Sequence, residues 1–314
     1  MKQSAIHLSQ FLKRVWSKIW DYIEFQASVV WAVFSSKRAF LAFLKRVPYY
    51  LGMILFALTI VAPLGWVILT SLKSNPEIFG SPWTLAKSPQ WANYANAWSK
   101  EGIGSAFKNT TIVTIVTLLI LVPVGAMAAY IFAKYPFRGS KTLFGIFLGG
   151  MMFPNFLIVI PLYFLLGSFG MLDTLTGLVV AYVAYSLSFT IFVLTGFFQA
   201  LPNELAEAAQ LDGCGHFSTF SRIMLPLAKP GLIVVGIFNA IGLWNEYPLA
   251  RVLVVSNEKR TLPLSIVDLA TANQYAADWG ALFAGLVIVM LPVLAVYWVF
   301  RDKIHETMLA GAVK

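Results

Sequence analysis

Residues 207–226 read EAAQLDGCGHFSTFSRIMLP, a comparatively polar stretch inside a chain that is otherwise rich in apolar residues. The stretch is long enough for two short helices, which a simple connecting loop would not need. Asn203 can cap the first helix, and Gly213 can adopt the left-handed conformation that ends it. We expect the second helix to begin near His216 and to end at Pro226. Its expected apolar stripe consists of Phe217, Phe220 and Met224.

The composition places the rest of the chain in a membrane. Of its 314 residues, 59% are hydrophobic and 12% are charged, and the mean hydropathy is +0.75. Hydrocarbon about 30 Å thick needs roughly 20 apolar residues in a helix, because the backbone must satisfy its own hydrogen bonds there. The predicted fold class is therefore all-α, a polytopic membrane protein. We expect six spans, at residues 47–72, 110–133, 142–167, 175–198, 230–255 and 279–300.

The basic residues predict the orientation of these spans. Lys and Arg number 23 against 14 acidic residues, which gives a net charge of +9. Most of the basic residues fall in segments that would be cytoplasmic if the N-terminus were cytoplasmic, as the positive-inside rule requires. We therefore expect both termini and residues 207–226 in the cytoplasm. Topology accounts for the positive charge, so we expect no nucleic-acid partner.

Residues 1–46 precede the first predicted span and form a separate predicted segment. Apolar residues recur there at helical spacing with Trp, Lys and Arg between them, which is typical of an amphipathic helix in the plane of the lipid headgroups. The alternative is a seventh span, but the longest uncharged stretch, residues 25–36, is too short to cross a bilayer. A partner subunit could also bury the same face. The repeating apolar positions are Leu8, Leu12, Val15, Ile19 and Ile23.

Polar side chains inside the predicted spans indicate a solute pathway, because such groups are costly in lipid unless they are paired or face water. Amide and carboxyl groups can hydrogen-bond sugar hydroxyls, and aromatic faces can pack against the C–H face of a sugar ring. The alternative is helix packing, or anchoring at the interface, with Glu246 paired to Arg251 or to another chain. The same alternative is the default for small and hydroxyl residues such as Ser186 and Gly125. The pathway candidates are Asn155, Asn239, Trp244, Asn245, Glu246 and Tyr247.

The sequence contains no catalytic or metal-binding pattern. Residues 138–142, RGSKT, lack the upstream glycine and the Gly-Lys order of a phosphate-binding loop. The three histidines have no metal-ligand spacing, and no nucleophile, base and orienting acid can be assembled. We therefore expect no cofactor and no enzymatic activity in this chain. Uphill transport would need work from a separate subunit.

The quoted stretch resembles the signature of the transmembrane subunits of bacterial ATP-binding-cassette importers. The signature places EAA, three residues, Gly, nine residues, Ile, one residue and Leu-Pro in this order, and the stretch matches every position. In that family the loop, here about residues 200–229, is the coupling helix held by a groove of the cytoplasmic ATPase. The resemblance thus assigns ATPase coupling to Glu207, Ala208, Ala209, Asp212, Gly213, Ile223, Leu225 and Pro226.

Further runs resemble the smaller permease of maltose-type transporters within the carbohydrate-uptake branch. They are WNEYPL at residues 244–249 and the C-terminal MLAGAVK, and the likeness covers residues 47–314. It implies a six-helix permease in the bacterial cytoplasmic membrane, paired with a homologous second permease. It also implies two copies of an ATPase that bind ATP and Mg²⁺, an extracytoplasmic solute-binding protein and a carbohydrate substrate.

Three alternatives remain open at the level of sequence. An identical chain could supply the second half of the pathway, and importers of amino acids, peptides or ions carry the same coupling signature. An ion-driven secondary transporter would belong to another class and would need paired intramembrane acids on inverted repeats. Glu246 is the one acid well inside a predicted span, and residues 47–133 and 175–255 show no repeat.

Overall fold

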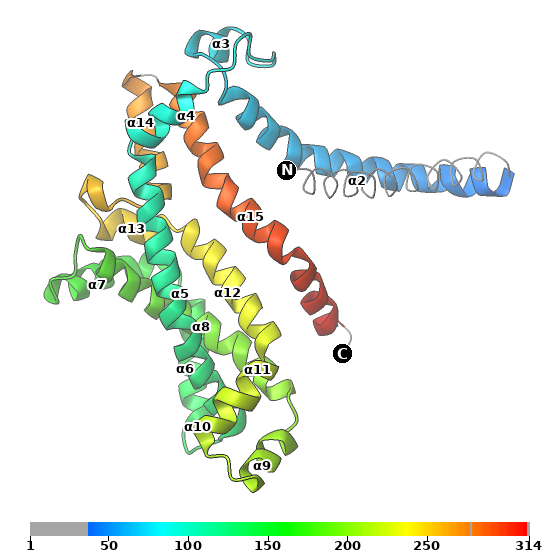
Figure 1. Ribbon diagram of the computed structural model, residues 1–314, viewed down its shortest axis with the longest axis vertical. Helices are drawn as coiled ribbons and strands as arrows, with labels where there is room; N and C mark the ends of the chain where they lie inside the picture. Colours follow the sequence, from blue (N-terminus) through cyan, green and yellow to red (C-terminus); the bar gives the residue numbers. More distant parts are fainter. Residues whose placement is uncertain (1–36, 277, 313–314) are drawn as a thin grey trace, which may run out of the picture. The chain divides into compact units, whose positions relative to one another are not determined.

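The computed structural model of the chain describes residues 37–276 and 278–312, with side chains at 45–154, 156–272 and 278–301. The described backbone is helical and contains no strand (Figure 1). The chain divides into two compact units, residues 1–66 and residues 67–314. The predicted amphipathic helix around residues 8–23 lies outside the described residues.

The first unit contains most of the long helix α2, Lys37–Thr70. Residues 45–71 of this helix are long and apolar enough to cross a membrane. The helix runs without a break through residues 46 and 47. The first predicted span therefore forms one continuous helix with the basic residues that precede it.

The second unit is built around the parallel pair α5, Ile103–Lys134, and α8, Leu175–Ala200, which make the most extensive helix contact of the described chain. Val113 shares a cluster with Leu178 near their N-terminal ends, and the ring of Tyr130 contacts that of Phe198 near their C-terminal ends. Small residues permit the close approach, since a Cβ atom on Gly125 would collide with the side chain of Thr190. The expectation of helix packing at Gly125 is confirmed. The helices around this pair are α6 (Ser140–Met152), α7 (Asn155–Ser168), α12 (Lys229–Trp244), α13 (Pro248–Leu253), α14 (Leu262–Ala276) and α15 (Trp279–Ala312).

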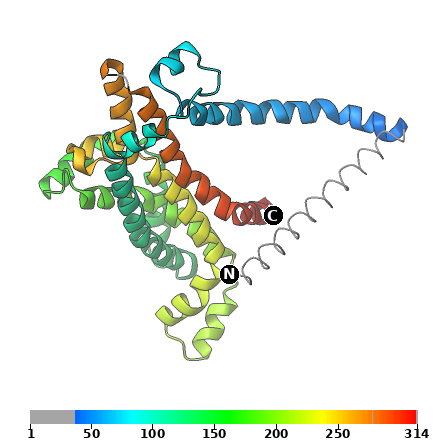
Figure 2. The same ribbon diagram turned by 45° about the horizontal axis from the view of Figure 1, so that its top comes forward.

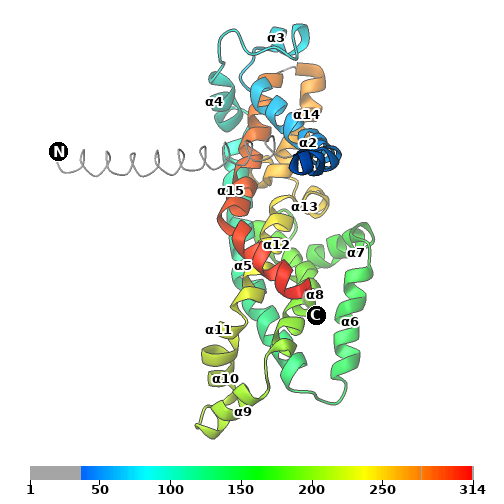
Figure 3. The ribbon, with the colours of Figure 1, turned by 90° about the vertical axis from the view of Figure 1, so that its right-hand side faces the viewer.

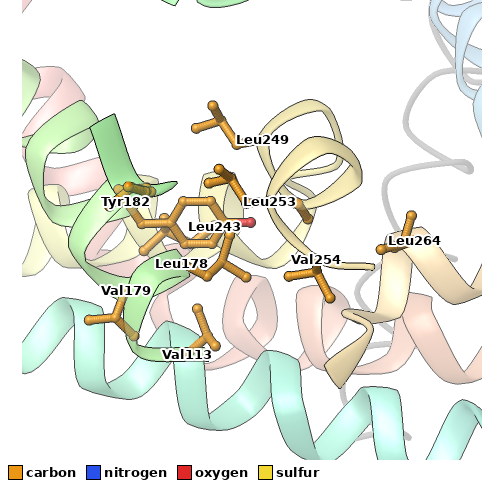
Figure 4. Close-up of a cluster of buried hydrophobic side chains, with 12 residues drawn as sticks. Val113, Leu178, Val179, Tyr182, Leu243, Leu249, Leu253, Val254 and Leu264 are labelled. Atoms are coloured by element: carbon orange, nitrogen blue, oxygen red, sulfur yellow. The ribbon is translucent and has the colours of Figure 1, made fainter. Parts of the chain in front are cut away.

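Three buried apolar clusters hold the second unit together. The first joins α5, α8, α12, α13 and α14, and Figure 4 shows Leu178 and Tyr182 of α8 facing Leu249 and Leu253 of α13. The second joins α5 and α8 to the segment that contains the quoted stretch. The third joins α4, Ala92–Ser99, to α5, α14 and α15. Small helices, α3 (Asn75–Gly80) and α4, lie at the end of the unit opposite to α9 and α10 (Figures 1 and 2).

The third predicted span is not one continuous helix. α6 ends at Met152 and α7 begins at Asn155, and the two helices are bent by 108° (Figure 3). Pro154 causes the break, because it has no N–H to donate and it holds Phe153 in an extended conformation. Within the described residues, four helices are long and apolar enough to span a membrane, or six when each of two bent pairs counts as one span.

The fifth predicted span, residues 230–255, is also interrupted. α12 ends at Trp244, three residues follow without helix, and α13 begins at Pro248. The helix α14 between the fifth and sixth predicted spans was missed, because its apolar positions alternate with polar ones over too short a stretch to suggest a span. The sixth predicted span is confirmed as part of α15.

Candidate functional site

The quoted stretch belongs to what we call the EAA segment, residues 200–229, which projects from one end of the second unit (Figures 1 and 2). Its first helix, α9, covers Glu204–Leu211 and carries two acidic residues in its first turn, where the helix dipole favours them. Gly213 has φ +85° and ends the helix as predicted. Asn203 stands at the predicted position, but its side chain makes no capping hydrogen bond. The capping role is therefore wrong.

The second part of the EAA segment begins at His216, as predicted, but it is not a uniform α-helix. α10, His216–Thr219, continues as a π-helical turn, η1, over Phe220–Met224, and then as α11, Leu225–Leu227. The helical run ends at Leu227, one residue after the predicted end at Pro226. A bend of 74° separates this helical run from α12. π-turns of this kind are frequent at functional sites.

One side of the EAA segment is packed against the helix bundle. Ala206, Ala209, Phe220 and Met224 are buried in the second apolar cluster. The ring of Phe220 lies 5.1 Å from that of Tyr130 on α5, measured between centroids. The alanines allow α9 to approach the bundle closely, whereas larger side chains would push it away.

The other side of the EAA segment exposes apolar as well as charged residues. Leu211 is 89% exposed and Phe217 is 73% exposed. The ring of Phe217 lies 6.4 Å from that of Phe220, as the predicted stripe requires, but only Phe220 and Met224 are buried. Glu207, Ala208, Asp212 and His216 are also exposed. Exposed large apolar side chains on a rigid base, rimmed by polar residues, are typical of a protein-binding surface.

Polar contacts fasten the EAA segment to the end of α5. The Lys134 ammonium donates to the Leu201 carbonyl and to Asn203 Oδ1, the latter at 2.7 Å. The Tyr135 hydroxyl lies 3.1 Å from His216 Nδ1 and accepts from Gln210 Nε2 at 3.3 Å. Contacts from both α9 and α10 thus converge on two consecutive residues at one helix end.

The WNEY run lies at the break between α12 and α13. Glu246 Oε1 accepts the Leu249 N–H at 2.7 Å, and Oε2 accepts the Ala250 N–H at 3.1 Å. The hydroxyl of Tyr182, from α8, also donates to Oε2. The carboxylate therefore caps the first turn of α13 and ties it to α8.

The predicted pairing of Glu246 with Arg251 is wrong. Arg251 Nη1 instead lies 3.0 Å from Asp268 Oδ1 of α14, and Arg260 lies 2.9 Å from the other oxygen of Asp268. The Arg251 side chain thus reaches from α13 to α14. The Glu246 carboxylate instead accepts hydrogen bonds from the backbone of α13 and from the Tyr182 hydroxyl of α8.

The remaining residues predicted for a solute pathway have separate positions. The Trp244 indole N–H donates to the Val289 carbonyl at 3.2 Å, and Trp244 is buried. The Asn245 side chain bonds to its own helix at the Ile241 carbonyl. Tyr247 packs against the first apolar cluster, and Asn155 is the first residue of α7.

Asn239 and Glu246 line a common cavity of about 480 Å³ between α6, α8 and α12. Asn239 is 6% exposed, and its Nδ2 donates to Thr190 Oγ1 and to the Val235 carbonyl. The sequence did not predict the aromatic and hydroxyl residues that accompany them, because α8 and α12 are apolar on nearly every face and show no stripe. The full lining consists of Gly150, Met151, Phe153, Tyr185, Ser186, Phe189, Phe238, Asn239, Gly242, Leu243, Glu246 and Pro248.

The loop between α7 and α8 is fastened to the loop after α13 by hydrogen bonds and an ion pair. Asp173, between α7 and α8, has φ +54° and accepts hydrogen bonds from the backbone N–H groups of Val255 and Ser256, both at 2.9 Å. The Ser256 hydroxyl also donates to it, and Lys259 lies 3.2 Å away. Hydrogen bonds from Ser256 and Val255, with a contribution from Lys259, hold the pKa of Asp173 well below its ordinary value. This carboxylate joins the α7–α8 loop to the loop after α13.

Among the side chains that the structure describes, no group of three or more His, Cys, Asp or Glu residues is placed to hold a metal ion. The described structure thus combines a helix bundle, an EAA segment with an exposed apolar side, and a cavity between α6, α8 and α12.

Comparison with known families identifies the class. Residues 121–301, more than half of the chain, match the family described as the inner membrane component of binding-protein-dependent transport systems. The chain belongs to this family, whose members are the permease subunits of ATP-binding-cassette importers. The predictions of an all-α importer permease and of a transport subunit rather than an enzyme are confirmed.

Several curated relatives cover most of the chain. The diacetylchitobiose uptake system permease protein NgcG of Streptomyces coelicolor is 40% identical over 82% of this chain and 86% of its own length. The trehalose transport system permease protein SugB of Mycobacterium tuberculosis is 30% identical over 80% of this chain and 92% of its own.

A solved structure shows the same fold. A bacterial ABC transporter involved in the import of the acidic polysaccharide alginate contains a chain that is 25% identical, with a TM-score of 0.69 over 85% of this chain and 98% of that one. A second alginate transporter structure, solved in complex with an alginate pentasaccharide-bound periplasmic protein, has a TM-score of 0.61 at 18% identity. The second likeness supports the fold alone.

Proposed function

We propose that this chain is the permease subunit of an ATP-driven importer for a sugar or oligosaccharide and forms half of its translocation pathway. The single observation that carries the coupling part is the two-sided EAA segment, which is packed and hydrogen-bonded on one side and exposes Leu211 and Phe217 on the other. The sugar class is supported by the relatives named for uptake of diacetylchitobiose and trehalose.

In this proposal a cytoplasmic ATPase binds the exposed side of the EAA segment. The contacts of Lys134 and Tyr135 with α9 and α10 join the segment to α5. α5 is packed along α8, so a rigid-body displacement of the segment moves both helices and the cavity that α8 lines. Binding and hydrolysis of ATP on the partner would thereby change access to the pathway.

The full assembly that we propose has the subunits implied by the resemblance to maltose-type importers. A second, homologous permease supplies the other half of the pathway, and two ATPase copies bind ATP and Mg²⁺. An extracytoplasmic solute-binding protein delivers the sugar. Both termini and the EAA segment lie in the cytoplasm, as the distribution of basic residues predicts.

Coupling can be tested by replacing the most exposed leucine of the EAA segment with a charged residue. We expect Leu211→Asp, in the complete transporter, to lower ATPase co-purification and ATP-dependent sugar uptake at least about tenfold, because a charge would be desolvated at an apolar contact. The matched control is Leu85→Asp, at a leucine 71% exposed between α3 and α4, which should retain the ATPase. Full ATPase retention and uptake in Leu211→Asp, or sugar uptake by the chain without any ATPase, would refute the proposal.

A further inference from the structure

The cavity between α6, α8 and α12 has polar atoms that the fold does not use. Ser186 is 6% exposed, and among the described residues its hydroxyl has no hydrogen-bond partner. Asn239 donates twice through Nδ2, but its Oδ1 accepts no hydrogen bond from a described residue. Neither of these two atoms is fully enclosed by protein, so both are open to the cavity, where a bound ligand or water can hydrogen-bond to them.

Aromatic rings form much of the remaining wall. Tyr185, Phe189 and Phe238 all line the cavity, and the rings of Phe189 and Phe238 meet edge to face at 6.3 Å. Tyr185 is 43% exposed and Phe238 is 57% exposed, so both retain free ring surface. Apolar rings beside a few oriented polar groups form the combination that binds small ligands in sites of roughly 300–1,000 Å³.

The charges around the cavity limit the ligand to a neutral or weakly charged molecule. Glu246 is the one acidic residue of the lining, and its oxygens are occupied by the N–H groups of Leu249 and Ala250 and by the Tyr182 hydroxyl. No Lys, Arg or His belongs to the lining residues of this cavity. An anionic sugar would thus meet a carboxylate without a compensating cation, which is unfavourable at low local dielectric.

We propose that this cavity is a binding subsite for a neutral sugar, in which Ser186 and Asn239 hydrogen-bond ring hydroxyls and Tyr185 packs against the C–H face of the ring. The assignment rests on the proposed function and adds a restriction to it, because the subsite excludes sugars that carry carboxylates. Glu246 positions α13 at the edge of the subsite and does not bind the sugar.

Thiol labelling tests the subsite directly, because the chain has a single natural cysteine, Cys214. In a Cys214→Ser background, Ser186→Cys would be treated with a small maleimide in the complete transporter. We expect at least one of N,N′-diacetylchitobiose, trehalose and maltotriose to slow labelling about threefold or more. We expect diguluronate at the same concentration to have no effect. The control is Ser168→Cys, at an exposed serine that does not line the cavity, where no sugar should change the rate.

A second variant tests whether the sugar protects residue 186 by binding against Tyr185 or only by blocking access to the cavity. Tyr185→Ala, combined with Ser186→Cys, should abolish protection by the neutral sugar. Tyr297→Ala, at a tyrosine of α15 that is 53% exposed and outside this lining, should preserve it. Each variant would first be shown to assemble with its partners in normal yield.

The outcomes distinguish this inference from the proposed function. If the wild-type transporter takes up a neutral sugar with ATP but Ser186→Cys is never protected, is never labelled, or is protected equally by diguluronate, the subsite is wrong and the function stands. If the wild-type transporter takes up no sugar at all, the proposed function fails and the subsite fails with it.

Discussion

The EAA segment and the break at residues 245–247 both interrupt helices, and both contain a run that resembles a family pattern, yet their side chains are used differently. In the EAA segment, Leu211 and Phe217 remain exposed while Ala209 and Phe220 are buried. At the break, by contrast, the carboxylate of Glu246 is fully occupied by groups of the same chain.

This difference shows two reasons why a short run of residues can resemble a family pattern. A run can be required by a partner, in which case its side chains are exposed and their loss leaves the isolated subunit stable. It can also be required by the fold, in which case its side chains are buried or bonded and their loss destabilises the chain. The break belongs to the second kind, and the EAA segment combines both.

The largest effect should come from removing the carboxylate at the break. Glu246→Ala leaves two backbone N–H groups and the Tyr182 hydroxyl without their acceptor, so we expect a loss of about 3 kcal/mol or more in the free energy of unfolding. Denaturant titration of the purified subunit measures it. Asn245→Ala is the control, since its exposed side chain bonds only within its own helix, and we expect a change within about 0.5 kcal/mol. Equal losses in the two variants would contradict the assignment.

The next largest effect on stability should distinguish two adjacent alanines of the EAA segment, one buried and one exposed. Ala209 is 3% exposed, so Ala209→Leu should overpack the contact with the bundle and cost about 1–3 kcal/mol of stability. Ala208 is exposed, so Ala208→Leu should leave stability unchanged but weaken ATPase co-purification. Thermal unfolding of the subunit and pull-down of the ATPase measure the two effects. A stable Ala209→Leu protein would remove the distinction between the two sides.

A smaller effect is expected at the turn between α9 and α10. Gly213 has φ +85°, so Gly213→Ala should cost about 1–2 kcal/mol through backbone strain. Gly215 is the matched control, because it has φ −71° and an added Cβ would meet nothing within 4 Å at either glycine. Unfolding of both variants, measured side by side, should show a loss at Gly213 alone, and similar values would exclude strain as the reason.

The smallest effect concerns the contact between the α7–α8 loop and the loop after α13, and it depends on pH. Because the folded state lowers the pKa of Asp173, its carboxylate stabilises the protein above its ordinary pKa of about 4 and loses this contribution as the pH falls toward the lower folded value. The stability difference between wild type and Asp173→Asn should therefore be full at pH 6 and shrink below about pH 4. A difference that stays constant or grows on acidification would assign another role to Asp173.

Much of the fold could be predicted from sequence, since runs of about 20 apolar residues predict helices whatever their neighbours are. The helix break at Pro154 was visible as a proline but was not predicted, because prolines are also tolerated inside helices, as Pro123 is in α5. The π-turn over Phe220–Met224 was not predicted, and its first residue, Phe220, packs against Tyr130 and Phe198, which are far away in the chain.

The candidate sites were only partly accessible from sequence. The spacing in residues 207–226 located the EAA segment, but Phe217 and Phe220 differ in exposure because Phe220 packs against Tyr130 and Phe198, which are distant in the chain. In the cavity, Asn239 and Glu246 could be selected as polar residues in an apolar span, whereas Tyr185 and Phe238 could not. An aromatic residue on a membrane helix faces lipid, another helix or a cavity with the same local sequence around it.

The sequence by itself determined the helical class, the polar segment between the fourth and fifth spans and the residues able to interrupt a helix, because hydrophobic length, glycine conformation and proline geometry act within a few residues of chain. Only the tertiary structure decided that Glu246 caps α13 rather than pairing with Arg251. It also decided which residues of the EAA segment are exposed and which residues of α6, α8 and α12 surround one cavity. These outcomes depend on contacts between residues far apart in the chain, and those contacts exist only after the helices have packed.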